Sequence, residues 1–177
     1  ELVSFAKLPA ATFVKGPTAG RRQGAGALPG HAGPYRGKQP VQGFSGLAAL
    51  GRGRYQVLVD NGYGALENSA DHRLVMYAMT PRWQAGSVAV GRATPLSDPQ
   101  RHLPWTLVHQ LNGRGRPLTG ADLDPEAIAR DPDGSWWIGD EHGPFVVHVG
   151  ANGRVLAPPC ALPGVRAPQS PYTEETA

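Results

Sequence analysis

Residues 124–144, DPEAIARDPDGSWWIGDEHGP, decide the fold, because they allow a helix start, a calcium-binding loop or a pair of strands. A helix capped by Asp124 would contain only the short apolar run AIA before DPDG breaks it. An EF-hand beginning at Asp131 would need Gly at its sixth position and Glu at its twelfth, where Trp136 and His142 stand. Two strands joined by a tight turn at DPDG remain.

The same plan occurs 81 residues earlier, in GLAALGRGRYQVLVDNGYG. Both stretches consist of a strand, a tight turn, a strand led by an aromatic residue, and an acidic residue shortly before glycine. Propeller blades of four strands recur at roughly 40 to 50 residues, so this offset corresponds to two blades or to one blade with a long insertion. The equivalent pairs are Gly46 and Ala127, Leu47 and Ile128, Ala48 and Ala129, Gly53 and Gly134, Tyr55 and Trp136, Val57 and Ile138, Asp60 and Glu141, Asn61 and His142, and Gly62 and Gly143.

The rest of the 177 residues fits one all-β domain. Glycine (24) and proline (18) separate short apolar runs such as YQVLVD, RLVMYAM and PFVVHV, a pattern typical of strands and turns. We expect an extended, loop-rich segment with a first strand over 1–43, and propeller blades with a Pro-rich C-terminal tail over 44–177. A further strand is predicted at WTLVHQL, 105–111.

Composition excludes several functions. The net charge of +3 comes from scattered arginines without interleaved aromatics, so nucleic acid is not expected as a partner, whereas an anionic small molecule is compatible. No apolar run is long enough for a transmembrane segment. Cys160 is the only cysteine, which rules out an internal disulfide. Ser45 in GFSGL has Leu47 where a nucleophile elbow needs Gly.

Polar residues end both copies of the repeated plan. Glu126 begins one strand, and Asp140 and Glu141 end the next, so antiparallel pairing returns them to one edge of a sheet. Asp60 and Asn61 end the earlier copy in the same way. Carboxylates that converge repel one another unless a cation neutralises them, and oxygen ligands at irregular spacing suit Ca²⁺ better than Zn²⁺. The pattern predicts a calcium site built from these five residues.

Solvated turn residues are the competing interpretation of the acidic side chains. Both interpretations stay open for Asp140 and Glu141, the metal is favoured for Glu126, and the turn is favoured for Asp131 and Asp133. His142, beside Glu141, is a candidate general base or phosphate ligand, and its alternative is an ordinary surface histidine.

The stretches GFSGLA, DPEAIARDPDGSWWIGDEHGPFVVHV and LPGVRAPQSPY resemble the bacterial "esterase-like activity of phytase" family of secreted or periplasmic β-propellers. The resemblance spans about Pro9 to Tyr172 and is most specific over 124–171. Two residues depart from it: Ala127 stands where the family usually has Gly, and His142 where it usually has Tyr.

The resemblance implies a secreted or periplasmic, calcium-dependent hydrolase of phosphate or carboxylate esters. Glu126, Asp140 and Glu141 would lie in its metal and catalytic centre, with Glu141 or His142 activating water. A non-catalytic propeller with structural calcium and a lactonase-like hydrolase are the alternatives. Family members are longer, so we expect this chain to form about half a propeller, roughly three blades. A second chain from the same precursor would complete it, with Cys160 as a candidate disulfide partner.

Overall fold

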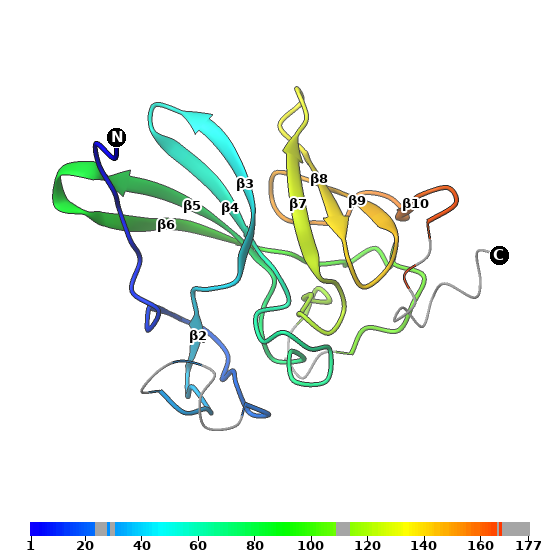
Figure 1. The fold of residues 1–177 in the computed structure, drawn as a ribbon. Helices are drawn as coiled ribbons and strands as arrows, with labels where there is room; N and C mark the ends of the chain where they lie inside the picture. Colours follow the sequence, from blue (N-terminus) through cyan, green and yellow to red (C-terminus); the bar gives the residue numbers. More distant parts are fainter. Residues whose placement is uncertain (24–27, 29–30, 109–113, 166, 168–177) are drawn as a thin grey trace.

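The structure is a computed structural model that describes residues 1–23, 28, 31–108, 114–165 and 167 (Figure 1). Apart from one 3₁₀ turn, η1 (Trp83–Ala85), all regular elements in these ranges are β-strands, which confirms the all-β prediction. They form three antiparallel sheets, none of which closes on itself. Two of the sheets have four strands and the third has two, where the sequence predicted roughly three blades.

Each four-stranded sheet is a meander in which consecutive strands pair. The first sheet contains β3 (Phe44–Gly51), β4 (Arg54–Val59), β5 (Val75–Arg82) and β6 (Ser87–Pro95). The second sheet contains β7 (Pro125–Arg130), β8 (Trp136–Asp140), β9 (Phe145–Val149) and β10 (Cys160–Ala161). The small sheet pairs β1 (Phe13–Lys15) with β2 (Lys38–Pro40). The division expected between 1–43 and 44–177 stays a prediction.

The predicted repeat is present in the strand register. Leu47 pairs with Val57 in the first sheet, and their equivalents Ile128 and Ile138 pair in the second. A bulge near the start of the first strand also recurs, between Phe44 and Gly46 and again 81 residues later. The offset therefore spans one sheet with a long insertion, residues 96–124, and not two sheets.

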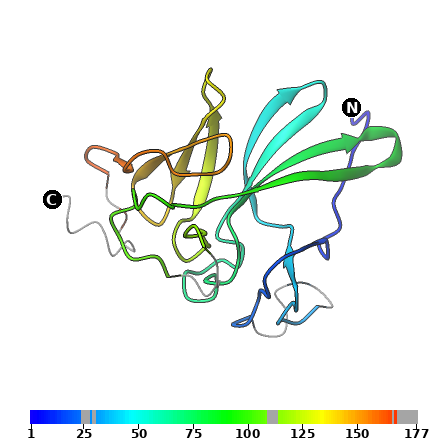
Figure 2. The same ribbon diagram turned by 180° about the vertical axis from the view of Figure 1, so that it is seen from behind.

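The two sheets pack against each other with their first strands side by side (Figures 1 and 2). Gly46 of β3 makes this possible, because a Cβ there would lie 2.9 Å from Ile128 Cγ2 and 3.0 Å from Leu58 Cβ. Leu58 and Ile138 are fully buried in the shared core. Burying a side chain of this size contributes about 1.5–3 kcal/mol to stability, so the interface is a main source of it.

Described residues of the insertion 96–124 contact the loop that leads into β5. The backbones of Leu74, Leu96 and Leu118 hydrogen-bond to one another in a closed ring, and all three side chains are buried. The prediction of a strand at WTLVHQL is wrong for 105–108, which have no regular structure, and 109–111 lie outside the described residues. Its apolar pattern reflects packing instead, because Trp105 is buried with its ring 5.2 Å from that of Phe145.

The two sheets differ mainly in one loop. Fifteen residues, 60–74, join β4 to β5, whereas four, 141–144, join β8 to β9, a difference of eleven. The longer loop folds around His72, which is fully buried and meets Tyr63 edge to face at 5.0 Å. Gly62 is required beside it, because a Cβ would lie 2.2 Å from His72 Nδ1 and the backbone has φ +86°.

None of the helices in the described part of the chain is long and apolar enough to span a membrane. Cys160 lies exposed on β10, the outer strand of the second sheet, as a free thiol. Its pairing with a second chain stays a prediction.

Gly46→Ala should destabilise the chain by about 1–3 kcal/mol, since the added methyl pushes the two sheets apart. Gly139→Ala is the matched control, because a Cβ at Gly139 would meet only Ala127 Cβ at an ordinary 3.4 Å. Urea unfolding of both variants measures the difference. Equal free energies of unfolding in the two variants would show that the fold does not depend on the close approach of β3 to β7.

Acid should weaken the fold between pH 6.5 and 4. Burial lowers the pKa of His72 to about 4, and the neighbouring Pro40 backbone opposes this only in part. In that pH range the unfolded chain therefore binds a proton that the native chain excludes, and the loss levels off below pH 4. The penalty is on the order of 3 kcal/mol. Unfolding free energies across this range should flatten in His72→Gln, and an unchanged slope in that variant would exclude His72 as the cause.

Candidate metal centre

Three segments meet at one end of the packed sheets: the loop after β4, the start of β7 and the loop after β8. They meet because β7 lies beside β3 and β4 while β8 returns along β7. The carboxylates of Asp124, Glu126 and Glu141 converge there, with one oxygen of each within 4.8 Å of the others. Asp124 is buried, whereas Glu126 and Glu141 are exposed and open to solvent.

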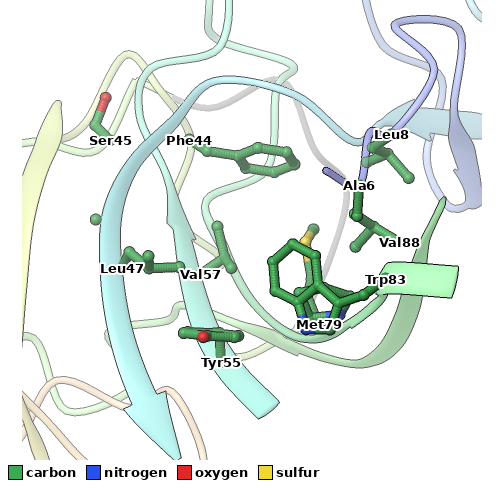
Figure 3. Close-up of a pocket in the computed structure, with 12 residues that line it drawn as sticks. Ala6, Leu8, Phe44, Ser45, Leu47, Tyr55, Val57, Met79, Trp83 and Val88 are labelled. Atoms are coloured by element: carbon green, nitrogen blue, oxygen red, sulfur yellow. The ribbon is translucent and has the colours of Figure 1, made fainter. Parts of the chain in front are cut away.

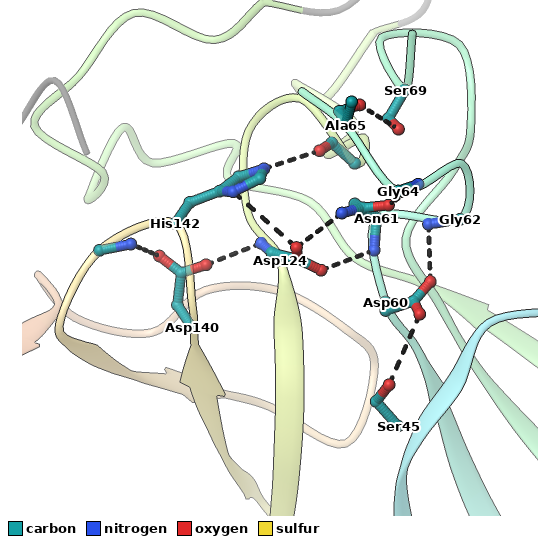
Figure 4. A network of polar contacts seen from close by, with 12 residues as sticks. Ser45, Asp60, Asn61, Gly62, Gly64, Ala65, Ser69, Asp124, Asp140 and His142 are labelled. Carbon is teal, nitrogen blue, oxygen red and sulfur yellow. Dashed lines mark hydrogen bonds and ion pairs between the residues drawn. The ribbon is translucent and has the colours of Figure 1, made fainter. Parts of the chain in front are cut away.

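Asp124 is fixed in place by the neighbouring sheet (Figure 4). Its two carboxylate oxygens accept hydrogen bonds from Asn61, one from the backbone N–H at 2.9 Å and one from the side-chain amide at 2.6 Å. Its own backbone N–H donates to Asp140 Oδ1 at 2.7 Å. The buried carboxylate thus joins the loop after β4 to the strands β7 and β8.

The structure brings together two of the five predicted ligands, Glu126 and Glu141. Asp140 lies behind them, with its oxygens accepting from the backbones of Asp124 and Gly143. Asp60 accepts from the Gly62 N–H at 2.6 Å. These hydrogen bonds make Asp140 and Asp60 supports for the backbone around the cluster.

Asn61 is also part of this support. Its amide oxygen accepts from the backbone N–H groups of Tyr63 and Gly64, at 3.1 and 2.6 Å, and its amide nitrogen donates to Asp124. Every polar atom of the side chain is therefore used within the protein. A ligand role for Asn61 stays a prediction.

Sequence reasoning missed Asp124 as a member of the cluster. Its position 81 residues earlier holds Gly43, so the repeat offers no acidic equivalent to draw attention to it. The available signal was its place directly before Pro125, two residues from Glu126, since alternate residues at a strand start point to one side.

The acidic side chains in and around the cluster have raised pKa values. The pKa of Glu126 is raised by partial desolvation and by Asp124, Glu141 and Asp60, although a hydrogen bond from Ser45 opposes this. Burial, with a smaller contribution from Asp124, raises the pKa of Asp60. Burial also raises the pKa of Asp140 well above its usual range. The site therefore carries an electrostatic cost that a cation would remove.

His142 lies over the cluster with its imidazole oriented by the backbone. Its Nε2 is 3.0 Å from the Gly120 carbonyl oxygen, which can only accept, so Nε2 carries the proton. Nδ1 is then the unprotonated nitrogen, and it lies 3.9 Å from Asp124 Oδ2. The neutral imidazole therefore presents its free nitrogen beside a carboxylate.

A polar cavity of ≈ 480 Å³ opens beside these groups. Asp124, Glu141 and His142 line one side of it. The longer loop of the first sheet lines the other side, with Asn61 and residues 64–67. A small ligand in this cavity would therefore contact both sheets.

The residues fit a hard divalent cation. Three carboxylates offer oxygen ligands only, two of them exposed and able to adjust, and such a set suits Ca²⁺ or Mg²⁺ better than Zn²⁺. The other acidic pair, Asp131 and Asp133, forms the turn between β7 and β8, as predicted. Asp133 accepts from the backbone and hydroxyl of Ser135, and Asp131 accepts from the Trp137 indole.

Comparison with known proteins gives one result. A family model described as "Phytase-like: Esterase-like activity of phytase" matches residues 39–175, which include both four-stranded sheets and the carboxylate cluster. No curated protein and no solved structure matches the chain.

Proposed function

The chain belongs to the family described as esterase-like activity of phytase, and on this premise we propose that it is a calcium-dependent hydrolase of phosphate or carboxylate esters. The observation that carries the proposal is the convergence of Asp124, Glu126 and Glu141 beside a polar cavity. Family membership supports a hydrolase in general. The cation and the ester class are the proposed part.

We further propose that the two four-stranded sheets are blades of a β-propeller. Three features support this: each sheet is a meander, the two sheets share one strand register, and their first strands lie side by side. First strands of propeller blades surround a central channel. The carboxylate cluster would then lie at one mouth of that channel.

Each residue has a distinct task in this proposal. Asp124 is a fixed ligand, because two hydrogen bonds from Asn61 hold both of its oxygens. Glu126 and Glu141 are exposed and can adjust to the ion and to the substrate. When bound, the cation would neutralise the cluster and polarise an ester oxygen. A secreted or periplasmic location suits such a site, since extracellular modules hold Ca²⁺ with modest affinity and few ligands.

His142 would activate the attacking water. It lines the cavity, and its Nδ1, the nitrogen that Gly120 does not engage, would accept the proton with Asp124 Oδ2 3.9 Å away. Glu141, the other predicted catalytic residue, lines the same cavity. Its exposed carboxylate serves better as an ion ligand, and we assign the base role to His142.

Replacing one ligand should weaken cation binding. Glu126→Gln and Glu141→Gln each remove one anionic oxygen donor and should lower Ca²⁺ affinity by at least about tenfold, as measured by calorimetry. Asp133→Asn is the matched control, because it removes the same charge from an exposed turn and keeps the turn's acceptor. An equal loss of affinity in all three variants would mean that Ca²⁺ binds the protein's overall charge and not this cluster.

His142→Gln should separate catalysis from binding. Loss of the base should lower kcat by about 10²–10⁴-fold on whichever phosphate or acyl ester is turned over, while Ca²⁺ affinity stays within twofold of wild type. A panel of phosphate monoesters, phosphate diesters and short acyl esters supplies the substrates. Undiminished kcat in His142→Gln would assign the base to another group.

Chelation distinguishes this enzyme from the alternative of a non-catalytic propeller with structural calcium. Loss of ester hydrolysis with an unchanged circular dichroism spectrum supports the enzyme. Loss of the fold, in a protein that hydrolyses none of the panel before chelation, supports the binding module.

A further inference from the structure

The first sheet has one apolar face that the described chain covers only in part, through Ala6 and Leu8 of the N-terminal segment. Leu47, Trp83 and Phe44 are 64%, 52% and 43% exposed on or beside it. Together with Tyr55, Val57 and Met79 they line a cavity of ≈ 480 Å³, into which Figure 3 shows these side chains pointing. Large apolar side chains gathered in this way typically mark an interaction surface.

The repeat shows what kind of surface this is. Leu47, Tyr55 and Val57 occupy the positions of Ile128, Trp136 and Ile138 in the second sheet. Those three residues lie on the face by which the second sheet packs onto the first, and Trp136 and Ile138 are only 4% and 0% exposed. The open face of the first sheet is therefore built like a face that is buried in the same chain.

The complementary surface is also open, on the far side of the second sheet. In the first sheet, the face that packs against the second sheet is formed by Gly46, Ala48 and Leu58. The equivalent positions in the second sheet are Ala127, Ala129 and Gly139, of which both alanines are exposed and the glycine is half-buried. Trp137, paired with Ala129 and stacked on His148 at 4.1 Å, adds an aromatic to this face.

We propose that the open face of the first sheet binds the outer face of the second sheet of another copy of this chain, in a head-to-tail arrangement. The contact between two copies would have the same geometry as the packing between the two sheets of one chain. Because the two faces differ, the association is heterologous and can extend beyond two copies, into a ring if the rotation closes.

A twofold contact between two open faces of the first sheet fits less well. It would set the face that carries Leu47 and Trp83 against an identical face with the same large side chains. The packing seen within the chain instead sets a large residue, Ile128, against the glycine at 46. Shape complementarity therefore favours the two unlike faces.

Ala127 sets the strength of the association. It stands at the position of Gly46, where the absence of a Cβ lets Ile128 approach. Its methyl group keeps the incoming Leu47 further away, so binding between copies is weaker than packing within the chain. Ala127→Gly should consequently tighten the association severalfold.

The test uses two variants that each disable one face. Leu47→Glu places a charge on the open face of the first sheet, and Ala129→Glu places one on the outer face of the second. Both positions are exposed, and circular dichroism and thermal unfolding check that each variant folds. Sedimentation velocity measures the mass of each variant, of their equimolar mixture and of the wild-type chain over a range of concentrations.

We expect the wild-type chain to exceed its 18.7 kDa monomer mass as concentration rises. Each variant should be monomeric alone, and the mixture should form a complex of two copies, because each retains one intact face. A wild-type chain that stays monomeric at all concentrations would overturn the proposal and indicate a different chain as the occupant. Loss of association in Leu47→Glu alone would also overturn it and indicate a twofold contact.

Discussion

The buried carboxylate of Asp124 is the point on which the two sheets and the candidate site depend. Two hydrogen bonds from Asn61 end on it, and its own N–H donates to Asp140, so one residue joins the end of β4 to the start of β7 and the end of β8. A buried carboxylate is costly without such partners. The same bonds that satisfy it also hold one oxygen ligand still while Glu126 and Glu141 remain free to move.

The fold and the chemistry therefore follow from one arrangement. Close contact of β3 with β7, made possible by the absence of a side chain at Gly46, brings strand ends of two sheets together. Partial desolvation raises the pKa of Glu126 there, and repulsion from the neighbouring carboxylates raises it further. Apolar packing in the core thus holds acidic groups close together, at an electrostatic cost that a bound cation would remove. The candidate metal centre is a direct result of how the sheets pack.

The strands and their repeat were predictable from sequence because each copy carries its own turn glycines and alternating apolar residues. Glu126 and Glu141 were predictable as neighbours because antiparallel pairing returns strand ends to one edge. Asp124 was overlooked despite its place two residues before Glu126, because the hydrogen bonds that fix it come from Asn61, which lies 63 residues away in the loop after β4. Trp105 was misjudged for a related reason, since local pattern cannot distinguish a strand from a buried loop that packs on Phe145.

The unequal loops after β4 and β8 face each other across the polar cavity. The short connection, 141–144, contributes Glu141 and His142 to its lining. The long connection, 60–74, forms the opposite wall and can vary in length or composition while the strands stay paired. Exchange of its tip for that of a related protein would therefore reshape the wall that a small ligand meets and leave the carboxylates of Asp124, Glu126 and Glu141 in place.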